Sequence, residues 1–296
     1  MLVSILTRLS VVLLLAMLVG VVSVIGIDRF RDGLSTWRET VRAITPIGLT
    51  LATVLSINKI SRQALVDISS QYGLRLGGLF YDIEGRFILL FQSIGNEWTA
   101  AFYSYIYIYA YVFLLAFPVI MYFVLSDTRT IRGLLASYTL NYTIGAVLYV
   151  VVHAFGPRQY IGEDVRWMLF DFRPSYQLLT AEVNTYTNVF PSLHTSLSAT
   201  VLLYAVRTHD RFPRWTPIAA FIAVNVWIAT MYLGIHWAID VVAGLVLAWG
   251  SVALADRLVG RFDVDRFFDP VWLRVDRLSK RIGDRVNRRF RRFGGG

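Results

Sequence analysis

Two histidines and one aspartate have the types and spacing needed for phosphate chemistry. His236 and Asp240 are four residues apart and would share one face of a helix. A carboxylate at this spacing can accept a proton from one imidazole nitrogen, which leaves the other nitrogen to act as a nucleophile or base. His194 precedes His236 by 42 residues and could donate a proton to a leaving oxygen.

The residues around these three could bind the phosphate group itself. Pro191 suits the first turn of a helix, whose free N–H groups and positive dipole end attract phosphate. Ser192 could donate a hydrogen bond. Arginine binds phosphate oxygens in pairs, and three arginines precede this segment: Arg158, Arg166 and Arg173.

Three other interpretations of the same residues remain open. His236 and Asp240 could be a structural hydrogen-bonded pair, or could relay protons in a transporter. A metal site would need further ligands, for which the segment between Arg158 and Pro191 offers Glu163, Asp164, Asp171 and Glu182. The chain has no cysteine, which excludes thiolate metal sites and cysteine nucleophiles.

Composition indicates a membrane protein. Hydrophobic residues make up 56% of the 296 residues and charged residues 17%, with a mean hydropathy of +0.54. Soluble proteins have about 25% charged residues. Charge-poor runs predict an all-α, polytopic transmembrane helix bundle, with about seven spans at 9–27, 43–58, 98–126, 133–157, 190–206, 216–233 and 236–255.

These spans suggest three regions and a sidedness. Residues 1–97 would hold the N-terminal spans and an outer interfacial segment, 98–256 a catalytic transmembrane domain, and 257–296 a basic cytoplasmic tail. The segments 28–42, 127–132, 207–214 and the tail carry the arginines, and the positive-inside rule makes their side cytoplasmic. Two crossings then bring His194 and His236 to the same extracytoplasmic face of a cell membrane.

The tail suggests a lipid partner rather than a nucleic acid. From Arg257 to Arg292 there are twelve Lys or Arg and five Asp, a net charge of +7. Apolar residues recur there at three- and four-residue steps after Asp269 and Pro270. A basic amphipathic helix directly after a membrane span suits an anionic lipid surface, although a solvated tail that only fixes topology fits equally.

Two stretches resemble motifs of the type 2 phosphatidic acid phosphatase superfamily. That superfamily has the motifs Lys-x6-Arg-Pro, Pro-Ser-Gly-His and Ser-Arg-x5-His-x3-Asp. The second motif reads Pro191-Ser192-Leu193-His194 here, and the third is kept at His236 and Asp240 after Tyr232-Leu233-Gly234. The leucine resembles the branch that contains inositol phosphorylceramide synthases.

The resemblance implies a six-helix phosphatase-like core and a role for each residue. His236 would form a phosphohistidine, Asp240 would orient it, and His194 would protonate the leaving alcohol and later activate the acceptor, without a metal or other cofactor. Water as the acceptor gives an integral-membrane phosphatase for polyprenyl or glycerolipid phosphates or diphosphates. An alcohol gives a head-group phosphotransferase similar to inositol phosphorylceramide synthase.

The sequence departs from the motifs at the arginines. Ala229-Thr230 replaces the Ser-Arg of the third motif. The first motif has two candidate counterparts. Arg166 and Arg173-Pro174 keep its spacing with arginine in place of lysine, whereas Gly156-Pro157-Arg158 resembles the Pro-Arg element of the synthase-like branch.

Overall fold

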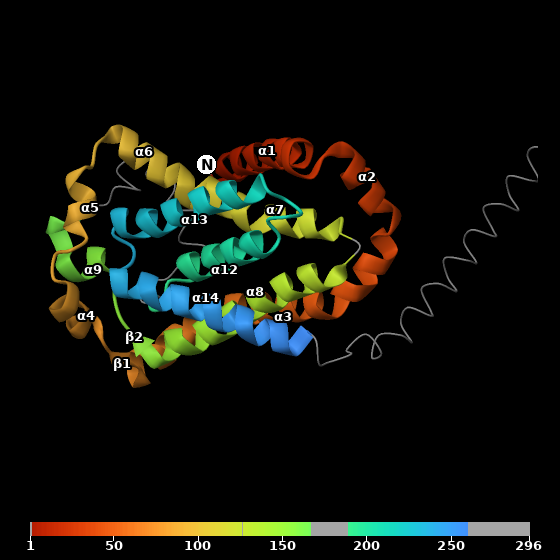
Figure 1. Cartoon of the computed structure of the whole chain (residues 1–296). Helices are drawn as coiled ribbons and strands as arrows, with labels where there is room; N and C mark the ends of the chain where they lie inside the picture. The colour runs from red at the N-terminus through yellow and green to blue at the C-terminus, as the bar shows by residue number, and fades with distance from the viewer. Residues whose placement is uncertain (1, 126, 167–188, 260–296) are drawn as a thin grey trace, which may run out of the picture.

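The computed structural model describes residues 2–125, 127–166 and 189–259, and these form a bundle of helices (Figure 1). The elements in chain order are α1 (Leu2–Gly20), a π-helical turn η1 (Val21–Ile25), α2 (Ile27–Ser35), α3 (Trp37–Tyr72), β1 (Leu74–Arg75), α4 (Gly77–Glu84), α5 (Leu89–Ser93), α6 (Glu97–Tyr105), a π-helical turn η2 (Ile106–Ala110), α7 (Tyr111–Phe123), α8 (Thr128–Val151), β2 (Val152–His153), α9 (Pro157–Ile161), a 3-10 turn η3 (Gly162–Asp164), α12 (Leu193–Arg207), α13 (Trp215–Tyr232) and α14 (Ala238–Val259).

The predicted all-α membrane bundle is confirmed, with six helices long and apolar enough to cross a membrane among the described residues. They span Leu6–Ile25, Trp37–Tyr72, Glu97–Phe123, Thr128–Val151, Trp215–Tyr232 and Ala238–Val259. The expected span at 190–206 is α12, which has 15 residues and is shorter than the roughly 20 needed to cross the hydrocarbon. α12 nevertheless lies at the centre of the bundle, between α8, α13 and α14 (Figure 1).

The largest departure from the predicted elements is α3. The sequence predicts a short span at 43–58 followed by an interfacial segment, but the helix continues without a break from Trp37 to Tyr72. Lys59, Arg62 and Asp67 lie within its second half, so their charges hid the continuation of the helix. α3 packs along α8, and Asn58 donates a hydrogen bond to the Tyr142 backbone oxygen at 3.5 Å.

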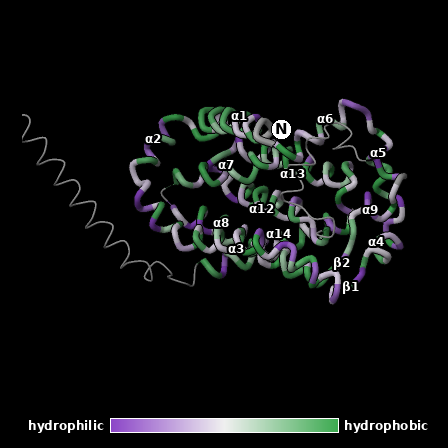
Figure 2. Tube along the Cα trace, turned by 180° about the vertical axis from the view of Figure 1, so that it is seen from behind, coloured by the Kyte–Doolittle hydropathy of each residue, from purple (hydrophilic) through white to green (hydrophobic). Residues whose placement is uncertain are grey.

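The outer faces of the bundle are apolar. Leu14, Leu18 and Val19 of α1 and Val246 and Trp249 of α14 are each more than 60% exposed, which water would disfavour and lipid would not. Hydrophobic residues predominate along the long helices, and hydrophilic residues gather mainly towards the two ends (Figure 2). This distribution is the one a membrane-spanning bundle requires.

The interior between α8 and α12 is polar. Asn141 of α8 donates to Thr200 Oγ1 of α12 at 3.1 Å and accepts a hydrogen bond from Ser196. Ser137 of α8 contacts the Tyr204 hydroxyl at 3.2 Å. Such hydrogen bonds hold helices together where both helix surfaces and lipid are equally apolar. They also explain why a helix at the centre of the bundle carries buried polar residues such as Ser196 and Thr200.

Short elements close the end of the bundle at which α12 and α14 begin. β1 and β2 form a two-residue parallel pair, Leu74 with Val152 and Arg75 with His153. α4, α5 and α9 gather at the same end (Figure 1), where Trp237 donates a hydrogen bond to the Phe155 backbone oxygen at 2.9 Å. Segments distant in sequence are thereby fixed around the residues just before α14.

Candidate active site

The two histidines lie side by side at one end of the bundle. α12 runs away from His194, α13 returns, and α14 begins two residues after His236. The two histidines are therefore far apart in sequence but close together in space. Their ring centroids are 6.1 Å apart with an interplanar angle of 57°. The expected convergence of His194 and His236 on one face is therefore observed.

Asp240 lies against His236 on the first turn of α14. Its Oδ2 is 3.4 Å from His236 Nδ1, but the angles do not make a hydrogen bond, and Nδ1 has no hydrogen-bond partner among the described residues. Oδ2 instead accepts the Trp237 backbone N–H at 2.8 Å. Both side chains are buried, since His236 is 3% and Asp240 0% exposed. A distance of 3.4 Å without a hydrogen bond is compatible with a catalytic pair, because catalytic hydrogen bonds are often long until substrate binds.

Burial controls the protonation state of His236. Removal from water lowers the pKa of His236 to about 4, and a hydrogen bond with the Val189 backbone opposes part of this change. Desolvation disfavours the charged imidazolium, so His236 is neutral at physiological pH. A neutral imidazole retains the lone pair that a nucleophile needs.

The loop before His236 has a fixed backbone. Gly234 has φ of +69°, and the N–H groups of Ile235 and His236 both donate to the Thr230 backbone oxygen, at 3.0 and 3.1 Å. A side chain at Gly234 would bring a Cβ within 2.7 Å of Val165. Thr230, where the superfamily motif has arginine, is fully buried, and its backbone shapes this loop.

Ser192 caps α12 and connects it to α14. Its Oγ accepts hydrogen bonds from the backbone N–H and the hydroxyl of Thr195, at 3.3 and 3.1 Å. Its own N–H donates to the Asp240 backbone oxygen at 3.0 Å. Pro191 precedes the helix rather than beginning it, which corrects the expected position. Ser192 therefore holds the start of α12 beside the residue that contacts His236.

The three arginines have different positions. Arg158 on α9 is 6% exposed. Its backbone N–H donates to the Gly234 backbone oxygen at 3.1 Å, next to the His236 loop. Arg166 has an exposed side chain, while its backbone N–H donates to Gln92 Oε1 at 3.0 Å. Arg173 lies outside the described residues. The structure thus brings Arg158, the candidate closest to the synthase-like pattern, to the histidine loop.

Glu84, which the sequence did not single out, occupies the N-terminus of α14. Its Oε2 accepts the Ala238 N–H at 2.8 Å, and its Oε1 accepts the Ile239 N–H. These amides are among the four that a helix leaves unpaired at its start. A carboxylate there also interacts favourably with the helix dipole. Glu84 and Asp240 together satisfy three successive N–H groups beside His236.

Two tyrosines, also missed by the sequence, flank His194. The ring of Tyr107 stacks on the imidazole with centroids 4.6 Å apart, and that of Tyr111 lies at 4.8 Å. The π-helical turn η2 lies between α6 and α7 and contains Tyr107; such turns are frequent at functional sites. The run of alternating tyrosines from Tyr103 to Tyr111 was the available signal.

Metal ligands do not cluster in the described part of the chain. No group of three or more His, Asp or Glu side chains there could hold a metal ion. Of the further ligands considered from the sequence, Asp164 forms an ion pair with Arg86, and Asp171 and Glu182 lie outside the described residues.

Comparison with protein-family models decides the family. The model of the PAP2 superfamily matches residues 80–254. The chain belongs to the PAP2 superfamily. The matched region contains Glu84, Arg158, His194, His236 and Asp240, and membership supports a phosphatase-type function. Searches of curated proteins and of solved structures give no match.

Proposed function

We propose that this PAP2 protein removes or transfers a phosphate-bearing group of a membrane lipid through a phosphohistidine on His236. The observation that carries the proposal is the arrangement of three side chains: two imidazoles 6.1 Å apart, with the buried Asp240 carboxylate 3.4 Å from Nδ1 of the second. A buried carboxylate that contacts one ring nitrogen leaves the other to attack phosphorus.

The first step exchanges one bond at phosphorus for another. Nε2 of His236 attacks once its hydrogen bond with the Val189 backbone is broken and the ring proton is on Nδ1, facing Asp240. The P–N bond forms and the P–O bond to the lipid alcohol breaks, while the imidazolium of His194 gives its proton to the departing oxygen. The negative charge of bound phosphate favours that imidazolium. In the second step neutral His194 takes a proton from the acceptor, whose oxygen replaces His236 on phosphorus. Asp240 stabilises the charge on His236 throughout.

Phosphate oxygens would be bound by the groups next to the loop. Two observations support Arg158 in this role: the residue is buried, and its backbone N–H donates to the Gly234 oxygen beside the His236 loop. Its guanidinium could disperse the charge that develops on phosphorus. Arg158 would take the role of the motif arginine, whose position Thr230 occupies in this chain. Ser192, Arg166 and Arg173 are further candidates, of which Ser192 lies closest to Asp240 in the described fold.

The acceptor separates two versions of the reaction. Water gives a phosphatase for polyprenyl or glycerolipid phosphates or diphosphates, and an alcohol gives a head-group phosphotransferase resembling inositol phosphorylceramide synthase. Leu193 has a packing role, because a Cβ on Gly145 of α8 would lie 2.7 Å from its side chain. The transferase version therefore rests more on the missing motif arginine than on this leucine.

The test is an assay of purified protein with a panel of lipid phosphates and diphosphates, with and without vanadate. We expect vanadate-sensitive phosphate release, or head-group transfer when an alcohol is supplied, and loss of both in His236→Ala. His209→Ala is a matched control, because His209 is exposed at the opposite end of α12 and should retain activity. Equal activity in wild type and His236→Ala would contradict the proposal, whereas proton flux without turnover would favour the transporter alternative.

A further inference from the structure

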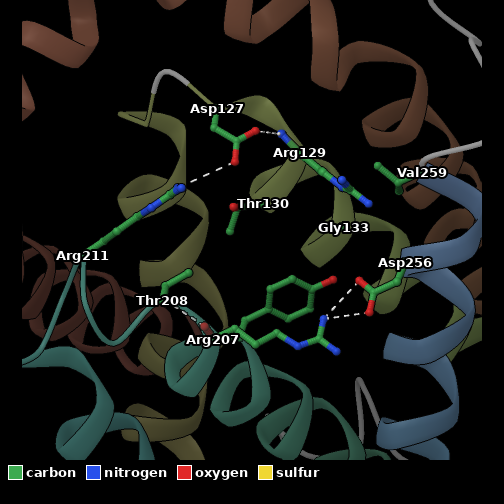
Figure 3. A pocket seen from close by; sticks show the side chains of 10 residues that line it. Asp127, Arg129, Thr130, Gly133, Arg207, Thr208, Arg211, Asp256 and Val259 are labelled. Atoms are coloured by element: carbon green, nitrogen blue, oxygen red, sulfur yellow. Dashed lines mark hydrogen bonds and ion pairs between the residues drawn. The ribbon is translucent and has the colours of Figure 1, made fainter.

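A second polar pocket lies at the end of the bundle opposite the histidines. It has a volume of about 200 Å³ and is formed where α8 begins, α12 ends and α14 ends (Figure 3). The 15 residues of α12 separate it from His194, which at 1.5 Å per residue is about 20 Å. The pocket therefore takes no part in the chemistry at His236.

The charges around this pocket do not balance. Arg207 of α12 pairs with Asp256 of α14, with its Nη1 at 3.0 and 2.9 Å from the two carboxylate oxygens. Arg211 lies 3.7 Å from Asp127. No acidic side chain of the described residues pairs with the guanidinium of Arg129, which also lines the pocket (Figure 3). Three arginines against two aspartates leave one positive charge.

The floor of the pocket is rigid and carries hydroxyl groups. Tyr204 is 4% exposed, and its hydroxyl contacts Ser137 at 3.2 Å. It sits against Gly133, where a Cβ would lie 2.6 Å from the Tyr204 oxygen. Thr208 beside it shares a hydrogen bond of 2.9 Å with Tyr122. The Tyr204 and Thr208 hydroxyls already donate to Ser137 and to the Tyr204 backbone oxygen, so the guanidinium groups at the rim are the part of the cavity that suits an oxyanion.

We propose that this pocket binds a phosphate group, and that its source is the head group of an anionic phospholipid. The pocket lies at the ends of membrane-spanning helices, which is the level of lipid head groups, and basic pockets between transmembrane helices bind such groups. One uncompensated positive charge matches the single negative charge of a phosphodiester. The half-exposed side chains of Arg207 and Arg211 remain accessible to it, because exposed ion pairs are weak.

The experiment measures lipid retention by the full chain in detergent, using native mass spectrometry. Phosphatidylglycerol is titrated against wild type, Arg129→Gln, Arg129→Lys and Arg31→Gln. Loss of one charge-assisted hydrogen bond should weaken binding roughly 10-fold or more in Arg129→Gln, with partial recovery in Arg129→Lys. Arg31→Gln is the matched control, because Arg31 is exposed on α2 and does not line the pocket; the basic tail is the same in all four proteins.

Each outcome decides one part of the proposal. Phosphatidylglycerol retention that 10 mM inorganic phosphate (about a physiological level) leaves unchanged supports the lipid head group, and displacement by phosphate overturns the lipid source in favour of free phosphate. Equal retention by wild type and Arg129→Gln overturns the site. An equal loss in Arg31→Gln would show a general charge effect and overturns it too. Thermal melting of each variant shows that folded proteins are compared.

Discussion

Burial of His236 links its reactivity to the stability of the fold. A buried imidazole is most easily kept uncharged, and the lowered pKa of His236, about 4, keeps its lone pair available through the physiological range. In the proposed mechanism, the nearby Asp240 carboxylate contributes at the stage when His236 carries a phosphoryl group and positive charge develops on the ring. The same burial that suits His236 to the proposed nucleophilic role therefore makes the stability of the fold sensitive to acid.

Stability should fall as the pH is lowered below the ordinary histidine value. The folded pKa of His236, about 4, lies below the unfolded value of about 6.5. Between these values the unfolded chain binds more protons, so the free energy of unfolding decreases on acidification by at most about 1.4 kcal/mol per pH unit. Thermal melting of wild type and His236→Gln between pH 7.5 and 4.5 measures this. A smaller acid-induced loss in the variant is expected, and parallel curves would refute the assignment to His236.

Asp240→Asn should show whether Asp240 acts on His236 or only stabilises the fold. Asparagine keeps the shape of the side chain and an oxygen for the Trp237 N–H, but it loses the charge that stabilises a protonated or phosphorylated His236. We expect kcat to fall about 100-fold or more with little change in KM or melting temperature. Asp256→Asn, the same change at the far end of α14, should keep wild-type kcat. An equal loss in both variants would mean that α14 responds to any lost charge.

The convergence of His194, His236 and Asp240 could be predicted from sequence, but their surroundings could not. His236 and Asp240 could be predicted because their four-residue spacing fixes a shared helix face. His194 could be predicted because two crossings return the chain to the same side. Glu84 could not be predicted, because its partners lie 154 and 155 residues away and an isolated glutamate at the end of a short helix carries no pattern. Tyr107 and Tyr111 resembled ordinary membrane aromatics.

At the scale of elements, the start of α14 is held from three directions. Glu84 from α4 binds its free N–H groups, Ser192 before α12 donates to the Asp240 backbone, and the Gly234 loop is tied to Thr230. The Trp237 ring packs edge-on against Tyr160 of α9 with centroids 6.1 Å apart. Such redundancy suits a catalytic group whose displacement by 1 Å can cost about 100-fold in rate.

Glu84→Gln should impair catalysis more than binding. The amide can accept one of the two N–H groups but presents its own NH2 to the other, so the start of α14 shifts and Asp240 with it. We expect kcat to fall about 10-fold at nearly unchanged KM. Both values are measured per folded protein, because a merely structural role would reduce the folded fraction without changing kcat.

The matched control for this prediction is Asp82→Asn on the same helix. Asp82 is exposed and should leave kcat unchanged. A Glu84→Gln variant with wild-type kcat would assign Glu84 to helix capping alone.

At the scale of the whole molecule, hydrophobic patterning predicted the bundle but misjudged its centre and its longest helix. Charge-poor runs predicted about seven spans, and six helices among the described residues are long and apolar enough to cross a membrane. α12 is surrounded by other helices, so its residues pack against protein rather than lipid and include Ser196, Ser198 and Thr200. The run at 190–206 was recognised as a helix, but at 15 residues α12 is too short to count as a membrane span.

Sidedness remains a prediction from the basic loops, and the chain offers a direct measurement because it contains no cysteine. Asp82 is exposed at the histidine end and Arg31 at the opposite end. With the active site extracytoplasmic and the C-terminus cytoplasmic, a membrane-impermeant maleimide should label Asp82→Cys in intact cells and Arg31→Cys only after permeabilisation. The reverse labelling would place the histidines on the cytoplasmic side. Lipid phosphates would then reach the site from the inner leaflet, and the arginine pocket would face outward, so one labelling experiment fixes the side of both sites.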